Sequence, residues 1–352
     1  MVEVPIHFKL REQGLSKIPR FEIIHSIKSM LVIGLYKFKT LRNSVYLNLE
    51  SEYCPICHSI YISRILGKKQ TGKESLNNLR CSQETSTGHP TLMKCYICGH
   101  IFSHKSEWPE NTESSYHEVE DDLYLQFENV KKKTFLFVYE YLESFKVSSP
   151  QIFDKVLEIG SYAGIFLDVL RTNSVSAVGV EPSRWGFEKC IEKGHVVINA
   201  SFEDYFIKYS PKNEYSLVTS WDVLEHVESP GDFIKYASIA LKKNGYFVFS
   251  TLDVENWFPK LMGNKWPWYM PMHLHYFKDK TIKDLLISNG FEFVDKRAYR
   301  SYASLKYAGT RFLSSIGISK KACDFIGFFI PKITIPFYFG DVAMYTARKI
   351  SN

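Results

Sequence analysis

The chain lacks any long run of apolar residues. Although 45% of its 352 residues are hydrophobic, no stretch reaches the roughly 18 apolar residues of a helix that crosses a membrane. Residues 1–5 contain no basic region followed by an apolar core, so no secretory signal is predicted. These two absences argue against a membrane-spanning or secreted protein. We expect a cytoplasmic protein, with peripheral contact at a membrane as the alternative.

A strong excess of charge of one sign is also absent. The chain has 44 lysine and arginine residues against 38 aspartate and glutamate residues, which leaves a net charge of +6. This balance is too mild for the basic surface of a nucleic-acid-binding protein, so no nucleic-acid partner is expected. It remains compatible with an anionic substrate or an anionic membrane surface. Nothing in the composition indicates an oligomeric state.

Cysteine is scarce and odd in number, with seven residues in the chain. Four of them form two Cys-x-x-Cys pairs, a pattern that argues against a disulfide framework and for a reducing compartment. Four thiolates in two such pairs are typical of a structural zinc site with no open position. Residues 51–104 are therefore predicted to be a zinc-ribbon-like module, in which Cys81 is a less favoured replacement ligand. The predicted zinc ligands are Cys54, Cys57, Cys95 and Cys98.

The chain is too long for one core of about 100–200 residues, so more than one unit is expected. Its first part mixes basic and apolar residues, with helix-like spacing at 21–38 that fits either a packing arm or a membrane-surface helix. The predicted domains are an arm at 1–50, the zinc-binding module at 51–104, a helical linker or lid at 105–150 that holds a helical pair, and an α/β domain at 151–352.

From residue 152 onward, strand-like and helix-like segments alternate, which predicts a doubly wound, mainly parallel sheet of seven strands. The last strand is expected to be antiparallel. An apolar segment at 301–340, before that strand, is predicted to be a helical insertion. Its run at 325–331 and its neighbours Lys320, Lys321 and Lys332 fit either a packed cap or contact with an anionic surface. The strands are predicted at 155–159, 177–181, 196–199, 215–220, 246–251, 291–300 and 341–349.

The loop after the first predicted strand reads Glu-x-Gly-x-x-x-Gly, with Glu158, Gly160 and Gly164. A dinucleotide site prefers Gly-x-Gly-x-x-Gly, because a pyrophosphate must approach the helix closely. Here Tyr162 occupies the third position of that pattern. The acidic residue suits a cofactor with a cationic amino-acid tail and no phosphate. Glu181, at the end of the second predicted strand, is placed to accept both hydroxyls of a ribose.

These motifs together resemble the class I S-adenosylmethionine-dependent methyltransferases over roughly residues 152–300. The resemblance rests on residues 156–160, 180–183 and 222–227, and it continues through 241–246 and 273–277. It implies S-adenosylmethionine as cofactor, with Ser201 and Phe202 beside the adenine and Asp222 near the methionine. The cofactor-binding residues that it implies are Glu158, Gly160, Ser161, Gly164, Glu181, Ser201, Phe202 and Asp222.

Methyl transfer to a hydroxyl, amine or carbon is assisted by loss of a proton, and a neutral histidine is the usual base near pH 7. Three histidines are candidates: His226, His273 and His275. The last two follow an aromatic loop at 256–275 and share a face if they are extended. The alternative for each is hydrogen bonding that orders its loop. The loop itself is predicted to be a lid, a set of sugar-stacking rings or a packed segment.

A paired-cysteine module followed by such a domain is similar to bacterial methyltransferases of surface-polysaccharide and nucleotide-sugar pathways. This similarity implies a small-molecule or glycan acceptor, including a lipid-linked or nucleotide-linked sugar, and leaves O- and C-methylation open. The alternatives are an RNA or protein methyltransferase that uses the zinc module for recognition, or a non-catalytic scaffold. Intact Glu158 and Glu181 argue against the scaffold. The sequence Ser-Trp-Asp-Val at 220–223 is not an Asn-Pro-Pro-Tyr type, which argues against adenine or glutamine N-methylation.

Overall fold

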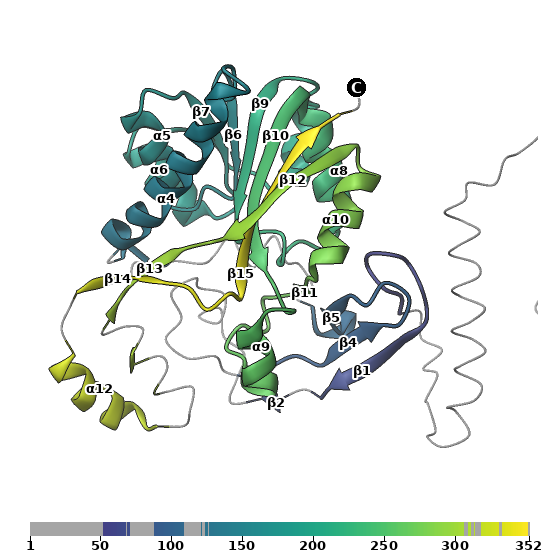
Figure 1. Ribbon diagram of the computed structural model, residues 1–352, viewed down its shortest axis with the longest axis vertical. Helices are drawn as coiled ribbons and strands as arrows, with labels where there is room; N and C mark the ends of the chain where they lie inside the picture. The colour runs from purple at the N-terminus through teal and green to yellow at the C-terminus, as the bar shows by residue number, and fades with distance from the viewer. Residues whose placement is uncertain are drawn as a thin grey trace, which may run out of the picture. The chain divides into compact units, whose positions relative to one another are not determined.

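A seven-stranded sheet organises the larger part of the chain (Figure 1). The computed structural model describes residues 52–67, 69–70, 88–108, 121, 124–125, 127–305, 309–310, 313, 318–330 and 333–350. The predicted arm at 1–50, Cys81 and the expected start of the helical linker near Glu118 lie outside these residues.

The strand order in this sheet is β12-β15-β10-β9-β6-β7-β8. Strand β15 runs antiparallel to both neighbours, and the other pairs are parallel. The predicted α/β fold, with seven strands and an antiparallel last strand, is confirmed. The strands are β6 (Val156–Ile159), β7 (Ala177–Val180), β8 (Val196–Ile198), β9 (Tyr215–Trp221), β10 (Leu241–Leu252), β12 (Phe291–Ala298) and β15 (Val342–Lys349).

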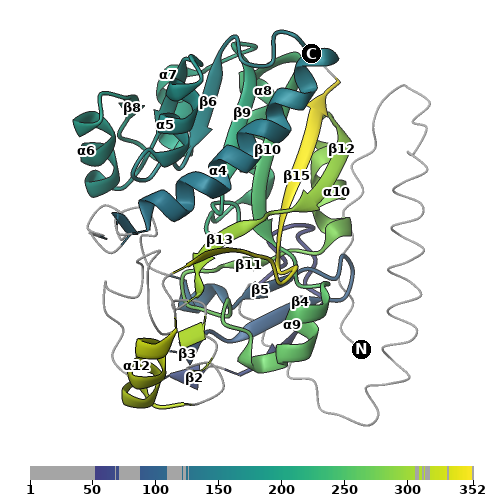
Figure 2. The same ribbon diagram turned by 60° about the vertical axis from the view of Figure 1, so that its left-hand side comes forward.

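Helices cover both faces of the sheet (Figures 1 and 2). Helices α4, α5 and α6 pack on one face, and α7, α8 and α10 pack on the other. Every residue of the central strands β6 and β9 is buried, as expected for parallel strands with two covered faces. The helices are α4 (Glu128–Glu143), α5 (Ile165–Thr172), α6 (Arg184–Glu192), α7 (Phe202–Tyr209), α8 (Pro230–Ala240) and α10 (Asp279–Ser288).

Three of these helices begin at a serine cap. The side chains of Ser183, Ser201 and Ser229 each accept a hydrogen bond from the backbone N–H three residues later. Such a bond satisfies a donor that the first helical turn leaves unpaired. Helix α7 was not predicted, although its aromatic residues Phe202, Tyr205, Phe206 and Tyr209 repeat at helical spacing. Among the described residues, the linker contains helical residues 124–125, α4 and the short 3-10 turns η2 (Lys105–Glu107) and η3 (Ser144–Val147).

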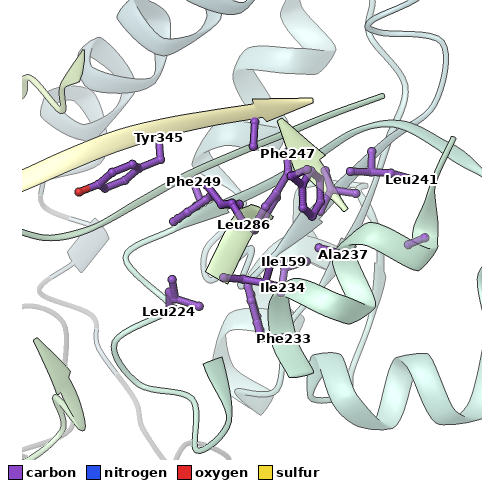
Figure 3. Packing of buried hydrophobic residues seen from close by; sticks show 14 of the residues in the cluster. Ile159, Leu224, Phe233, Ile234, Ala237, Leu241, Phe247, Phe249, Leu286 and Tyr345 are labelled. Carbon is purple, nitrogen blue, oxygen red and sulfur yellow. The ribbon is translucent and has the colours of Figure 1, made fainter. Parts of the chain in front are cut away.

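The core on the α8 and α10 side is rich in phenylalanine (Figure 3). Phe247 and Phe249 of β10 stack with ring centroids 4.6 Å apart. Phe233 and Ile234 of α8 and Leu286 of α10 pack in the same cluster. All of these side chains are at least 95% buried. The packing holds α8 and α10 against the sheet, and so places the loops at its edge.

The cysteine-containing segment forms a second sheet of order β1-β4-β5-β11. Its first three strands come from the predicted module, but β11 comes from the α/β part of the chain and pairs antiparallel with β5. The predicted boundary at 104 therefore does not separate two sheets. Residues 52–352 form one compact unit. The strands are β1 (Ile62–Leu66), β4 (Leu92–Cys95), β5 (Ile101–Ser103) and β11 (His275–Tyr276), with a separate pair β2 (Lys69–Gln70) and β3 (Gly88–His89).

The predicted helical insertion at 301–340 is wrong at both ends, where the backbone forms a strand pair. Strand β13 (Ser301–Ser304) precedes α12 (Lys320–Phe329) in the chain and β14 (Thr334–Phe337) follows it, and the two strands pair antiparallel. Phe325, Phe328 and Phe329 are 69%, 80% and 70% exposed, so these rings do not form the predicted packed cap. Within the described residues, no helix is both long and apolar enough to cross a bilayer.

The core makes a direct prediction. Phe247 is fully buried, and Phe247→Ala removes a ring and leaves a cavity, so we expect a loss of about 3–5 kcal/mol in the free energy of unfolding. Val147 is 93% exposed, and Val147→Ala should change this energy by less than about 0.5 kcal/mol. Urea unfolding followed by circular dichroism measures both. Equal stability of the two variants would contradict the core assignment.

Candidate active site and cysteine cluster

Acidic side chains gather where three neighbouring parallel strands end. Glu158 lies near the end of β6, Glu181 follows β7 and Asp222 follows β9. The chain reverses its direction of travel across the sheet between β6 and β9. Ligands of such sheets bind at this reversal, outside the carboxyl ends of the strands. The structure therefore brings together the three predicted acidic residues at the position where a cofactor is expected.

Glu181 is held in place by backbone donors. Its carboxylate accepts hydrogen bonds from the N–H of Tyr162 at 2.6 Å and of Ser183 at 2.8 Å. Burial raises its pKa to about 7. Oxygen atoms keep further lone pairs, so a carboxylate with two such bonds can still accept from ligand hydroxyls.

Glu158 is almost completely buried beside Glu181. Burial, and then the charge of Glu181, raise the pKa of Glu158 well above its usual range. Among the described residues, its Oε2 atom has no hydrogen-bond partner. A buried carboxylate oxygen without a partner is costly and calls for a donor. The amino group of an amino-acid tail would be a suitable donor, so this observation fits the cofactor that the loop motif predicts.

The glycine loop needs its glycines for space and backbone geometry. Gly160 has φ of +75°, and a Cβ atom there would lie 2.5 Å from a methyl group of Val223. Tyr162 has φ of +44°, and it still serves the loop through the N–H bond to Glu181. Its hydroxyl donates to Asp121 at 3.0 Å. Tyrosine at this position is therefore compatible with the site.

The side chains of the other predicted loop residues serve local structure. The Ser161 hydroxyl donates to the carbonyl of Glu158 at 3.4 Å. Ser201 caps α7, and the ring of Phe202 packs in the core 5.2 Å from that of Phe233. Any contact of Ser201 or Phe202 with an adenine would therefore come from their backbone or from the outer edge of the ring.

Asp222 has a left-handed backbone with φ of +55°. Its Oδ1 accepts from the Ser250 hydroxyl at 2.6 Å, and its N–H donates to the same hydroxyl at 2.9 Å. Burial raises the pKa of Asp222. Tyr299 is buried close enough that the charge of Asp222 contributes, after burial itself, to raising the pKa of the phenol. Ser250 and Tyr299 were not predicted; Ser250 stands near the end of a predicted strand, whereas no local pattern marks Tyr299.

Glu225, His226 and His273 form a second cluster, in which one ligand atom from each lies within 4.8 Å of the others; Glu225 and His273 are buried and His226 is half-buried. Carbonyl oxygens only accept, so His226 Nδ1 donates to Met272 at 2.9 Å and His273 Nδ1 donates to Trp268 at 2.8 Å. Burial lowers the pKa of His226 to about 4. Both rings are therefore neutral near pH 7, with an unprotonated Nε2.

Both ring nitrogens of His275 have protein partners. Its Nε2 lies 2.8 Å from the carbonyl of Val227, and its Nδ1 lies 3.1 Å from Nε2 of His100. The residue is fully buried. These two bonds support the alternative for His275, in which hydrogen bonding orders the loop.

The aromatic loop at 256–275 is anchored rather than open. It contains α9 (Trp257–Met262) and the 3-10 turn η4 (Gly263–Lys265). The indole N–H groups of Trp266 and Trp268 both donate to Asp341, at 3.2 and 2.8 Å. Phe258 stacks on Phe339 at 4.2 Å. Of the three predicted roles, packing is the one that these contacts support.

Four thiols converge in the cysteine-containing sheet. The Sγ atoms of Cys54 and Cys98 are 3.5 Å apart, as are those of Cys57 and Cys95. All four Sγ atoms lie within 4.8 Å of one another. Zinc–sulfur bonds of about 2.3 Å place tetrahedral ligands about 3.8 Å apart, so the donor set and its spacing fit a four-thiolate metal site. Both knuckles end in a left-handed residue, His58 at φ +55° and Gly99 at φ +75°.

Parts of the chain are similar to known methyltransferases. A family model described as a methyltransferase domain matches residues 121–296. The ubiquinone biosynthesis O-methyltransferase of Bradyrhizobium diazoefficiens is 31% identical over 109 residues, which are 29% of this chain and 41% of that protein. The protein of the same name from Pelagibacter ubique is 31% identical over 104 residues, covering 28% and 42%. The chain thus spans about two fifths of the length of these relatives.

A solved S-adenosylmethionine-dependent methyltransferase from Archaeoglobus fulgidus has 18% sequence identity and a TM-score of 0.41, and covers 65% of this chain and 100% of that one. The family model spans half of the chain and includes the three edge acids and the glycine loop. The chain therefore belongs to the methyltransferase-domain family.

Proposed function

We propose that this protein transfers a methyl group from S-adenosylmethionine to an oxygen of a small-molecule acceptor. The observation that carries the proposal is the position of His226, a half-buried neutral imidazole, on the turn that begins at Asp222, beside the acidic cofactor edge. The names of the relatives support an O-methylated small molecule. A glycan acceptor, including a lipid-linked or nucleotide-linked sugar, is the second candidate. Its only support is that a paired-cysteine module precedes the α/β domain in the chain.

Three residues at the sheet edge would accommodate the cofactor. Glu181 would accept the ribose hydroxyls, Glu158 would accept from the ammonium group of the tail, and Gly160 would leave space for the tail. Ser161, Gly164, Ser201, Phe202 and Asp222 complete the proposed cofactor-binding set. The bound cofactor supplies a methyl group on a sulfonium with a good leaving group, so the protein has mainly to align the acceptor and to exclude water.

His226 is the proposed base, with His273 as its neighbour. The two ring centroids are 4.7 Å apart. In each ring the Nδ1–H bond to a backbone carbonyl fixes the tautomer and leaves Nε2 as the proton acceptor. Glu225 lies in the same cluster, and burial raises its pKa to about 8. It is therefore mainly uncharged near pH 7.

The pKa of Glu181 predicts how cofactor binding depends on pH. The carboxylate form accepts ribose hydroxyls, and protonation below about pH 7 removes that form. Binding of S-adenosylhomocysteine should be level above pH 7.5 and should weaken by up to about tenfold per pH unit below 7. Glu181→Gln should bind about 1–3 kcal/mol more weakly, with a flat profile. Calorimetry from pH 5.5 to 8.5 measures both; a wild-type profile that is as flat as that of the variant contradicts the assignment.

A labelled-methyl assay tests the acceptor class. The protein is incubated with labelled S-adenosylmethionine and with separate small-molecule, lipid, glycan, RNA and protein fractions of a cell extract. We expect label in the small-molecule or lipid fraction. His226→Asn should lower this labelling by about 10²–10⁴-fold, the usual contribution of a general base, without loss of cofactor binding.

The matched control is His104→Asn, whose imidazole contacts Ser106 and Glu52 far along the chain from the turn. It should label at the wild-type rate. Label found only in the RNA or protein fraction would overturn the small-molecule proposal, and label only in the glycan fraction would select the second candidate. Full activity of His226→Asn would remove His226 from the mechanism.

We further propose that Cys54, Cys57, Cys95 and Cys98 bind one structural Zn²⁺. The close approach of four thiols supports this, because all four Sγ atoms lie within 4.8 Å of one another. A cation is what would allow all four to be thiolates. No ligand position would remain open, so the role of the metal would be to hold the fold of residues 51–104.

Metal analysis tests this site. The purified protein should contain about one zinc per chain, and Cys95→Ser should lose it together with the structure of the knuckles, since metal binding contributes on the order of 10 kcal/mol to such folds. Cys323→Ser is the control, because Cys323 is buried but lies outside the cluster. A metal-free wild-type protein whose cysteine sheet resists proteolysis would contradict the proposal.

Peripheral contact with a membrane stays a prediction. Its support within the described residues is the exposed face of α12, with Phe325, Phe328 and Phe329. The cytoplasmic location, the domain boundaries at 50, 104 and 150 and the arm at 1–50 likewise remain proposals from the sequence.

A further inference from the structure

Strand β11 lies between the cysteine-containing sheet and the proposed catalytic turn. On one side it pairs with β5, with His275 opposite Phe102, and the N–H of Ser103 donates to the carbonyl of Leu274 at 2.9 Å. On the other side, the N–H groups of Leu274 and His275 both donate to the carbonyl of Glu225, at 2.8 and 3.1 Å. Leu274, just before β11, and His275 thus join the cysteine segment directly to the turn formed by Glu225, His226 and Val227.

A second connection between the cysteine segment and the turn is made by two buried histidines, His100 and His275. The carbonyl of Val227 can only accept, so Nε2 of His275 carries the proton of that 2.8 Å bond. Burial lowers the pKa of His275 to about 3, so the ring is neutral and its Nδ1 must accept. Nε2 of His100, 3.1 Å away, is then the donor. The order of donation runs from His100 to His275 to Val227.

His100 belongs to the second cysteine knuckle. It follows Cys98 by two residues, and its carbonyl accepts from the N–H of Cys95 at 2.9 Å. Its ring is fully buried and packs against Phe102 and Phe277, with centroids 5.9 and 5.2 Å away. The contacts of the ring other than its one donated bond are therefore apolar among the described residues, where its Nδ1 has no hydrogen-bond partner.

A buried polar nitrogen that has no partner is unfavourable, and a hydrophobic ring would fill the same space without that cost. The imidazole of His100 is thus explained by the bond that it donates, rather than by packing. That bond reaches His275, whose own Nε2 donates to the carbonyl of Val227, the residue next to His226. The turn is held at three points, by the backbone of β11, by His275 and by the bond from His226 to Met272.

We propose that His100 and His275 are positioning residues of the methyl-transfer site, through which the cysteine knuckle sets the turn that carries His226. The inference rests on the proposed role of His226 as the base. In this role the cysteine segment would support the active-site turn and would not be a separate binding module. Neither histidine contacts the acceptor or the cofactor in this role.

The experiment follows the ring nitrogens of His226 by NMR in protein labelled with ¹⁵N-histidine. In the wild type we expect no titration of His226 between pH 5.5 and 7.5, because its pKa is lowered to about 4. His100→Phe keeps an aromatic ring but removes the donor. Release of the turn should bring the pKa of His226 back toward its usual value of about 6.5, so that it titrates within this range.

Two further variants separate positioning from general structural damage. His100→Gln places an amide donor near the position of the imidazole Nε2, and it should restore the wild-type signals. His104→Phe removes another histidine of the same segment, whose contacts are Ser106 and Glu52, and it should leave His226 unchanged. Titration of His226 that is identical in the folded His100→Phe variant and in the wild type would overturn the proposal.

A second measurement, on the wild type, tests the proposal if the His100→Phe variant does not fold. In the wild type, the ¹⁵N shifts should show His275 and His100 both protonated at Nε2; a proton on Nδ1 of His275 would reverse the order of donation and overturn the inference. Calorimetry with S-adenosylhomocysteine is run on the same samples. Absence of binding in the wild type would contradict the proposed function, whereas the coupling of His100 to His226 would still be read from the NMR signals.

Discussion

The two-residue strand β11 carries the connection on which the rest of this structure depends. It contributes one edge of the cysteine-containing sheet and, through the carbonyl of Glu225, one boundary of the turn that follows β9. Without β11, one edge of β5 would be unpaired and would expose backbone groups that need partners. Here those partners come from a segment more than 170 residues later in the chain. The cysteine segment and the methyltransferase sheet are therefore joined by obligatory backbone hydrogen bonds rather than by a flexible linker.

Charge and burial together explain the chemistry of the sheet edge. Glu158, Glu181 and Asp222 are acidic groups whose pKa values are all raised by burial. Placing such groups together opposes folding unless a ligand or backbone donor compensates. Backbone N–H groups compensate for Glu181, and the Ser250 hydroxyl does so for Asp222. Glu158 keeps an unpartnered oxygen among the described residues, and this oxygen is the proposed acceptor for the cationic tail of the cofactor.

Histidines of similar sequence context have quite different environments. His273 and His275 are two residues apart, and the sequence predicts the same role for both. In the structure His273 joins His226 and Glu225, whereas His275 binds His100 and Val227. Alternation along an extended segment tells which residues share a face but not which neighbours that face meets. A similar limit applies to Ser201 and Phe202, whose positions after a strand were predicted, but whose side chains cap a helix and fill the core.

The sequence by itself determined the local features of this protein. The alternating segments predicted the seven-stranded sheet, the glycines at 160 and 164 and the acids at 158 and 181 predicted the cofactor edge, and the paired cysteines predicted a four-thiol cluster. These features follow from short-range spacing, because a strand, a tight loop or a knuckle is specified by a few consecutive residues. Only the tertiary structure decided that β11 completes the cysteine sheet, that Asp341 anchors Trp266 and Trp268, and that Tyr299 lies near Asp222. Each of these contacts joins residues far apart in the chain, and their pairing depends on how whole elements pack rather than on any pattern within one of them.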